Sequence, residues 1–126
     1  MEVLVDSSVW IDYFKSGQNT EHLDELIDHN FIVINQVILS ELIPVLNLRK
    51  QVKLINLLLK LKTLEINIDW QEIMKTQYSL LKIGMNGVGV PDLIIEQNAR
   101  QNDVAIYSLD KHFQKLSQMT GITLLQ

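Results

Sequence analysis

The sequence predicts an α/β fold in which a central parallel sheet of four to five strands carries helices on both faces. Short, continuous apolar runs are typical of strands buried on both sides, and helical segments separate these runs. This alternation favours parallel strands joined by helical crossovers. The chain has 126 residues, the length of one ordinary domain, so we expect residues 1–126 to form a single domain.

The first half of the chain begins with the apolar run Val3-Leu4-Val5, which we interpret as a buried strand. Asp6-Ser7-Ser8 supplies side chains suited to a helix start, and Ser16-Gly17-Gln18-Asn19 is expected to end the short helix that follows. Pro44 is expected to kink the third helix or to mark a new start. A second strand is expected at 31–34, and helices at 9–14, 20–29, 36–46 and 49–62.

The second half contains a long helix that Asp69 is expected to cap and a helix whose first turn holds Pro91. Gly84, Gly87 and Gly89 lie between these helices and are expected to form a flexible loop. Strands are expected at 64–66, 104–107 and 122–125, and helices at 70–83, 91–100 and 110–119.

Composition narrows the classes of function. The chain has no cysteine, which excludes disulfides, thiolate zinc sites and cysteine nucleophiles. Neither a signal peptide nor an apolar stretch long enough to cross a bilayer is visible, so we expect a soluble cytoplasmic protein with no membrane partner.

The charge is unevenly distributed along the chain. The net charge is −4, but residues 1–48 carry −7 and residues 49–126 carry +3. The overall sign therefore does not exclude an RNA substrate, because phosphates are bound by local groups of cations. Candidate RNA contacts are Arg49, Lys50 and Lys53, at the start of the predicted helix 49–62. A solvated polar face explains them equally well.

Four carboxylates are placed close to the predicted ends of strands or the starts of helices: Asp6, Glu41, Asp92 and Asp110. Ligands of open α/β sheets bind beyond the carboxyl ends of the strands. Four acids gathered there would repel one another unless a cation neutralised them. Mg²⁺ (or Mn²⁺) suits such an oxygen donor set, and a metal-bound water can hydrolyse a phosphodiester.

Each of these residues also has a simpler interpretation. A single Asp after a strand is often a helix cap, and Glu41 alone suits a solvated helix face. Ser8 and Ser108 suit local turns as well as supporting roles beside the acids. The three histidines, at 22, 29 and 112, lack the spacing of metal ligands and are interpreted as structural or surface residues.

Taken together, the chain resembles the PIN domain, and most of all the small nucleases that act as toxins of VapBC-type toxin–antitoxin pairs. The segments that carry the resemblance are Val3-Leu4-Val5-Asp6-Ser7-Ser8-Val9-Trp10-Ile11, Leu39-Ser40-Glu41-Leu42, Val90-Pro91-Asp92-Leu93-Ile94-Ile95 and Ser108-Leu109-Asp110-Lys111-His112-Phe113. Their order and spacing cover the whole chain. Two positions depart from the family pattern, namely Ile43-Pro44-Val45 after Glu41, and Glu96 one turn after Asp92.

The resemblance implies a Mg²⁺- or Mn²⁺-dependent endoribonuclease that forms a homodimer and is silenced by a cognate antitoxin, through which alone it would reach operator DNA. Asp6 and Asp92 would be the nearest metal ligands, with Asp110 close to them. Glu41 would act directly or through water, and the hydroxyls of Ser8 and Ser108 would support the acids. One- and two-metal sites both remain open.

Other functions are compatible with parts of this pattern. A related housekeeping nuclease of RNA maturation would use the same acids. A phospho-accepting receiver domain shares the doubly wound fold, but it needs adjacent acids after the first strand, where this chain has Ser7 and Ser8. A catalytically inactive interaction module would not need all four acids.

Overall fold

The computed structural model describes residues 1–15 and 20–125, with only the backbone of Thr20 included. Its centre is a parallel sheet with the strand order β3-β2-β1-β4, formed by β1 (Val3–Val5), β2 (Ile32–Ile34), β3 (Lys62–Thr63) and β4 (Ala105–Tyr107). The predicted sheet of parallel strands is confirmed. The expected break at 16–19 lies outside the described residues.

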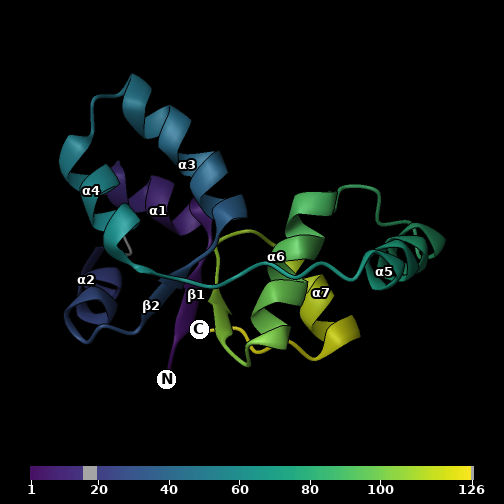
Figure 1. Ribbon diagram of the computed structural model, residues 1–126. Helices are drawn as coiled ribbons and strands as arrows, with labels where there is room; N and C mark the ends of the chain where they lie inside the picture. Colours follow the sequence, from purple (N-terminus) through teal and green to yellow (C-terminus); the bar gives the residue numbers. More distant parts are fainter. Residues whose placement is uncertain (16–19, 126) are drawn as a thin grey trace.

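The central strands are apolar because helices cover both of their faces. All residues of β1, β2 and β4 are buried. Figure 1 shows α1 (Ser7–Phe14), α3 (Gln36–Leu48) and α4 (Val52–Lys60) on one side of the sheet, with α6 (Val90–Gln101) and α7 (His112–Thr120) on the other. Helix α2 (Thr20–Asp28) packs on α1, and α5 (Trp70–Lys82) packs on α6 at the outer edge of the molecule.

Two predicted strands differ from the structure. The third was expected at 64–66, but β3 is shorter and lies earlier, at Lys62–Thr63. Pairing with β2 ends after the Leu64 N–H, which donates to the Ile34 carbonyl. The carbonyl of the following residue, Glu65, accepts from the Asn98 side chain instead of from β2. The strand expected at 122–125 is reduced to one bridge, between Ile106 and Leu124.

The helix around Pro44 is continuous. Helix α3 runs from Gln36 to Leu48 with Pro44 inside it, so the predicted new start at this proline is wrong. Asn35 caps this helix, because its Oδ1 accepts a hydrogen bond from the Ile38 N–H. The chain then turns at Arg49 and Lys50, so α4 begins at Val52 and is shorter than the helix expected over 49–62.

The core is continuous from one helical layer to the other. Trp10 and Phe113 are the largest fully buried side chains and lie on opposite sides of the sheet, on α1 and α7. On α4, Leu58 is buried and Leu54 and Leu57 are partly buried against this core, as is Leu61 directly after the helix. Core packing therefore explains the apolar face of α4.

Within the described parts of the chain, no helix is both long enough and apolar enough to cross a lipid bilayer.

Candidate metal-binding active site

Asp6 lies at the carboxyl end of β1 and points into a network of hydroxyl groups. The residue occupies the cap position of α1, but its side chain makes no capping hydrogen bond. Its Oδ2 instead accepts from Ser8 Oγ and from Ser108 Oγ, each at 2.9 Å. The carboxylate is buried, with 4% of the residue exposed. The capping interpretation of Asp6 is therefore wrong, and the two serines hold its carboxylate in one orientation.

Asp92 and Asp110 converge on this edge of the sheet, one from a helix and the other from the segment after a strand. Asp92 lies in the first turn of α6, and Asp110 follows β4, which pairs with β1. Ligand atoms of Asp92, Asp110 and His112 all lie within 4.8 Å of one another, which is close enough to surround one ion. The Asp110 N–H donates to Ser108 Oγ at 2.9 Å, so Ser108 joins Asp110 to Asp6.

His112 lies between the two carboxylates, although its sequence context predicted only a structural or surface role. Its Nδ1 is 3.5 Å from Oδ2 of Asp92 and 3.3 Å from Oδ1 of Asp110. Within the described residues this buried nitrogen has no hydrogen bond of good geometry. The segment Ser108-Leu109-Asp110-Lys111-His112 contained the only available signal, namely a histidine two residues after a predicted site acid.

The acids repel one another in the metal-free protein. Partial burial raises the pKa of Asp92 most, and the charges of Asp110 and Asp6 raise it further, while His112 opposes the change. Glu41 lies on α3 and reaches the surface, yet partial burial of its carboxylate, with the charges of Asp6 and Asp92, also raises its pKa. A hydrogen bond from Ser7 opposes the shift of Glu41. The charges of the four predicted acids therefore act on one another in one place, here called the acidic site.

Asp110 lies in the acidic site and also caps the start of α7. Its Oδ1 accepts from the His112 N–H at 3.0 Å, at the first residue of α7. The sequence-based cap interpretation therefore applies to this residue, although it does not apply to Asp6. The second carboxylate oxygen of Asp110 is not used by this bond.

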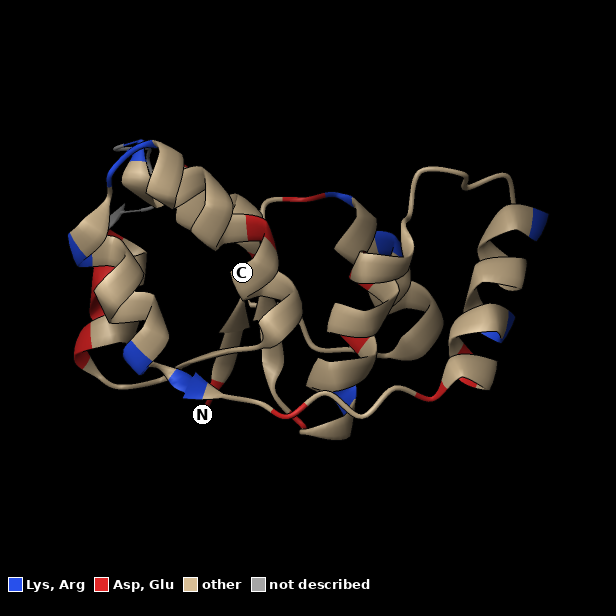
Figure 2. Ribbon diagram, turned by 45° about the horizontal axis from the view of Figure 1, so that its top comes forward, with Lys and Arg blue, Asp and Glu red and all other residues tan. Residues whose placement is uncertain are grey.

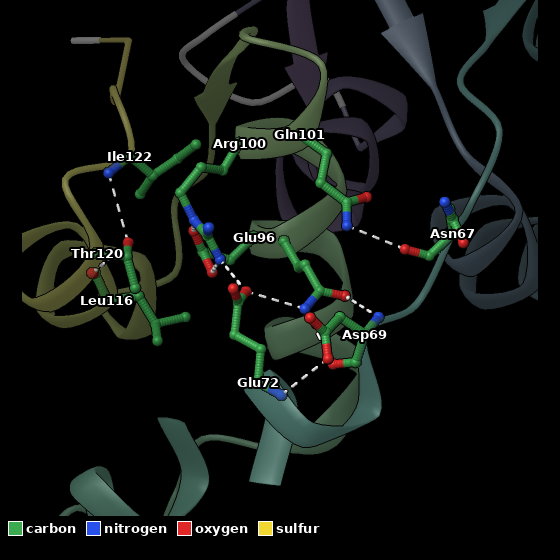
Figure 3. Close-up of polar contacts among 10 residues, drawn as sticks. Asn67, Asp69, Glu72, Glu96, Arg100, Gln101, Leu116, Thr120 and Ile122 are labelled. Atoms are coloured by element: carbon green, nitrogen blue, oxygen red, sulfur yellow. Dashed lines mark hydrogen bonds and ion pairs between the residues drawn. The ribbon is translucent and has the colours of Figure 1, made fainter. Parts of the chain in front are cut away.

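Glu96 lies outside the acidic site. It is buried and forms an ion pair with Arg100, whose Nε is 2.8 Å from Glu96 Oε2. Arg100 also pairs with Glu72 on α5, and Gln97 donates to the same Glu72 carboxylate (Figure 3). Glu96 is therefore neither a surface residue nor an additional acid of the acidic site. It belongs to a polar cluster between α5 and α6.

The candidate RNA contacts Arg49, Lys50 and Lys53 are exposed where α3 passes into α4. Figure 2 shows cations gathered at this end of the molecule. Lys62 belongs to β3 instead and pairs with Glu2 at 2.9 Å. The cations of the predicted helix 49–62 are therefore divided between a turn, a helix and a strand.

A parallel sheet with carboxylates gathered beyond the carboxyl ends of its strands is an arrangement that can hold a divalent cation. The chain belongs to the PIN domain family, which its sequence matches over residues 3–118. PIN domains are nucleases. The family resemblance deduced from the sequence is thereby confirmed. A comparison with curated proteins gave no match.

Solved structures share this fold at low sequence identity. A chain of VapBC2 from Rickettsia felis, bound to a DNA fragment from its promoter, is 17% identical with a TM-score of 0.73, and the match covers 99% of this chain and 98% of that one. DNA-bound VapBC from Salmonella typhimurium gives 19% identity and a TM-score of 0.69, covering 99% and 97%. FitAcB from Neisseria gonorrhoeae gives 16% and 0.65, covering 98% and 96%.

Proposed function

We propose that this protein is a Mg²⁺- or Mn²⁺-dependent endoribonuclease that hydrolyses single-stranded or looped RNA at the acidic site. The observation that carries the proposal is the convergence of Asp92, Asp110 and His112 beside the buried Asp6. The raised pKa of Asp92, caused by burial and by its acidic neighbours, marks a site that favours a bound cation.

The donor set fits a hard divalent cation. Asp6, Asp92 and Asp110 would supply carboxylate oxygens, the ligands that Mg²⁺ prefers beside water. His112 would orient the carboxylates of Asp92 and Asp110 rather than bind Mg²⁺ itself, because its Nδ1 lies near both. When bound, the metal would stabilise charge on the phosphate and lower the pKa of a bound water.

Other residues of the chain orient Asp6 and accept the proton of the attacking water. Ser8 and Ser108 hold Asp6 in a fixed orientation through hydrogen bonds to Oδ2. Glu41 is the proposed general base, because its raised pKa makes it a better proton acceptor than an ordinary glutamate. Water attacks phosphorus and its proton passes to Glu41. The bond from phosphorus to a ribose oxygen breaks, and that oxygen takes a proton from solvent.

Arg49, Lys50 and Lys53 are the proposed contacts to RNA phosphates on either side of the cut. Arg49 directly follows the end of α3, eight residues after Glu41 and about 12 Å further along the helix axis, and Lys53 lies at the start of α4. Exposed cations at this distance suit the backbone of a strand that passes over the acids. Replacing Arg49 and Lys53 with Gln should weaken RNA binding and reduce its dependence on salt.

In the cell, we propose the role of a cytoplasmic toxin in a type II toxin–antitoxin pair. Three solved structures with this fold are, by their descriptions, VapBC or FitAcB assemblies, and two of these hold DNA. The chain would form a homodimer, bind a cognate antitoxin protein and reach operator DNA only through it. A housekeeping nuclease of RNA maturation is the second candidate, because the same acids serve it.

Cleavage assays test the nuclease. The parent protein should cut single-stranded RNA only with Mg²⁺ or Mn²⁺, and Asp6→Asn or Asp92→Asn should abolish cutting while the far-UV circular dichroism stays unchanged. A matched control is Glu25→Gln, an exposed acid on α2. Cleavage by Asp92→Asn at the parent rate would contradict the assigned roles.

A growth assay distinguishes a toxin from a housekeeping nuclease. Expression of the parent should arrest growth of the host, and a small protein encoded beside it should restore growth. The Asp92→Asn variant should be harmless. Normal growth at high expression of an active parent nuclease would favour the housekeeping role.

A further inference from the structure

A cavity of about 410 Å³ adjoins the acidic site on the β4 side of the sheet. It is lined by residues of β4, of the turn that follows and of α7, by His22 of α2, and by Leu124 and Leu125 after α7. Two of its lining residues, Ser108 and Asp110, belong to the acidic site itself. Its volume falls within the range of about 300–1,000 Å³ that is usual for small-molecule sites.

The walls of this cavity combine apolar surface with hydrogen-bonding groups at the rim. Tyr107 and Phe113 lie beneath the cavity and are themselves buried, so most of its accessible wall comes from other residues. His22 lies against Tyr107, with the ring centres 5.2 Å apart. Leu109, with 46% of its surface exposed, and the exposed Gln114 stand at the rim. A flat heterocycle with donors and acceptors on its edge matches such a lining.

We propose that this cavity, here called the base pocket, receives one unpaired nucleobase of the RNA next to the scissile phosphate. The inference rests on the proposed nuclease function, since Asp110 would lie between the phosphate and the base. Unpaired bases can be turned out of a strand and stacked on aromatic or apolar side chains. The amide of Gln114 and the ring of His22 can then bind the base edge, because each offers a donor and an acceptor.

The pocket would make cleavage sensitive to one nucleotide beside the cut. The test uses single-stranded RNA with a mapped cleavage site, in which each nucleotide flanking the cut is replaced in turn by an abasic residue. Because one contact between a base and a protein side chain is lost, kcat/KM should fall about tenfold at one position. The loss should appear mainly in KM, because the acids and the phosphate are unchanged.

Substitutions of lining residues test whether the base pocket causes the discrimination between intact and abasic RNA. The double variant His22→Ala/Gln114→Ala should cleave the intact and the abasic RNA at equal rates. Gln118→Ala is the matched control, because Gln118 is an exposed glutamine one turn further along α7 and does not line the cavity. This control should keep the tenfold discrimination of the parent.

A binding measurement adds a readout that does not need cleavage. Saturation-transfer NMR should show transfer from the protein to the base protons of a nucleoside 5′-monophosphate, and the double variant should lose it. The inference fails if the parent cuts RNA with metal but treats every abasic substrate like the intact one, or if the double variant still discriminates. A parent that never cuts RNA would overturn the proposed function, and this inference with it.

Discussion

Asn35 and Asn98 form a fully buried hydrogen bond that joins the two helices carrying Glu41 and Asp92. Nδ2 of Asn35 donates to Oδ1 of Asn98 at 2.9 Å. The other side-chain atoms are also used, because Oδ1 of Asn35 caps α3 and Nδ2 of Asn98 donates to the Glu65 carbonyl. Two asparagines thereby fix the start of α3, the position of α6 and the chain that leaves β3.

Asn98→Ala should destabilise the protein strongly. The change leaves the buried amide of Asn35 without its partner, which costs about 1–3 kcal/mol, and it also removes the part-buried bond to the Glu65 carbonyl. Urea unfolding should show a lower midpoint. The control is Gln101→Ala, one turn further along α6, which removes an exposed bond to the Asn67 carbonyl and should cost at most about 1 kcal/mol. Equal losses for both variants would contradict a special role for the buried pair.

The sequence predicts local structure and the acids better than it predicts long-range polar contacts. Runs such as Val3-Leu4-Val5 identify strands because burial on both faces demands apolar residues. Asp6 and Asp110 are predictable for a similar reason, since parallel strands end at one edge of the sheet. Their convergence in the structure follows from the pairing of β1 with β4.

The missed residues share one physical cause. Whether a polar side chain is buried depends on partners that are far away in the sequence. Asn98 is 63 residues from Asn35, and the Arg100 that pairs with Glu96 also reaches Glu72, 28 residues away. His112 was missed because only the folded chain brings Asp92 beside it. None of these separations has a periodicity that a sequence pattern could reveal.

Arg100→Met should destabilise the protein because it isolates a buried charge. Glu96 is 2% exposed and relies on Arg100 as its ion-pair partner. Removal of one partner of a fully buried pair typically costs about 3–5 kcal/mol, and the loss here should be smaller because the Arg100 side chain is 34% exposed. The contrasting variant is Lys62→Met, which breaks the exposed pair with Glu2 and should cost at most about 1 kcal/mol. Thermal unfolding of both variants measures the difference, and a small effect of Arg100→Met would mean that water reaches Glu96.

Glu72→Gln should make the stability of the protein less dependent on pH in the acid range. Hydrogen bonds from Arg100 and Gln97 lower the pKa of Glu72 below its ordinary value of 4.5. Between the folded and unfolded pKa values the unfolded chain binds more protons, so stability falls as the pH falls through this window. The contribution is complete above about pH 4.5. Urea unfolding from pH 3 to pH 7 compares the two proteins. Parallel curves would contradict the pairing of Glu72 with Arg100.

Asp92→Asn should stabilise the metal-free protein at neutral pH and remove its response to metal. The pKa of Asp92 is raised, chiefly by burial, so between the unfolded and folded pKa values the folded protein binds more protons. Ionisation therefore lowers stability as the pH rises through this window, and the asparagine avoids that loss. In the parent, Mg²⁺ at a hundred times its Kd should add about 2.7 kcal/mol.

Thermal unfolding at pH 7 with EDTA or with Mg²⁺ separates these two effects of Asp92→Asn. The variant should have the higher midpoint in EDTA, and only the parent should gain from the metal, because the variant loses one carboxylate ligand and the repulsion that a cation relieves. Glu25→Gln, which changes an exposed acid on α2, should respond to Mg²⁺ as the parent does. If metal stabilises all three proteins equally, the ion binds elsewhere, and the acids beyond β1 and β4 do not form its site.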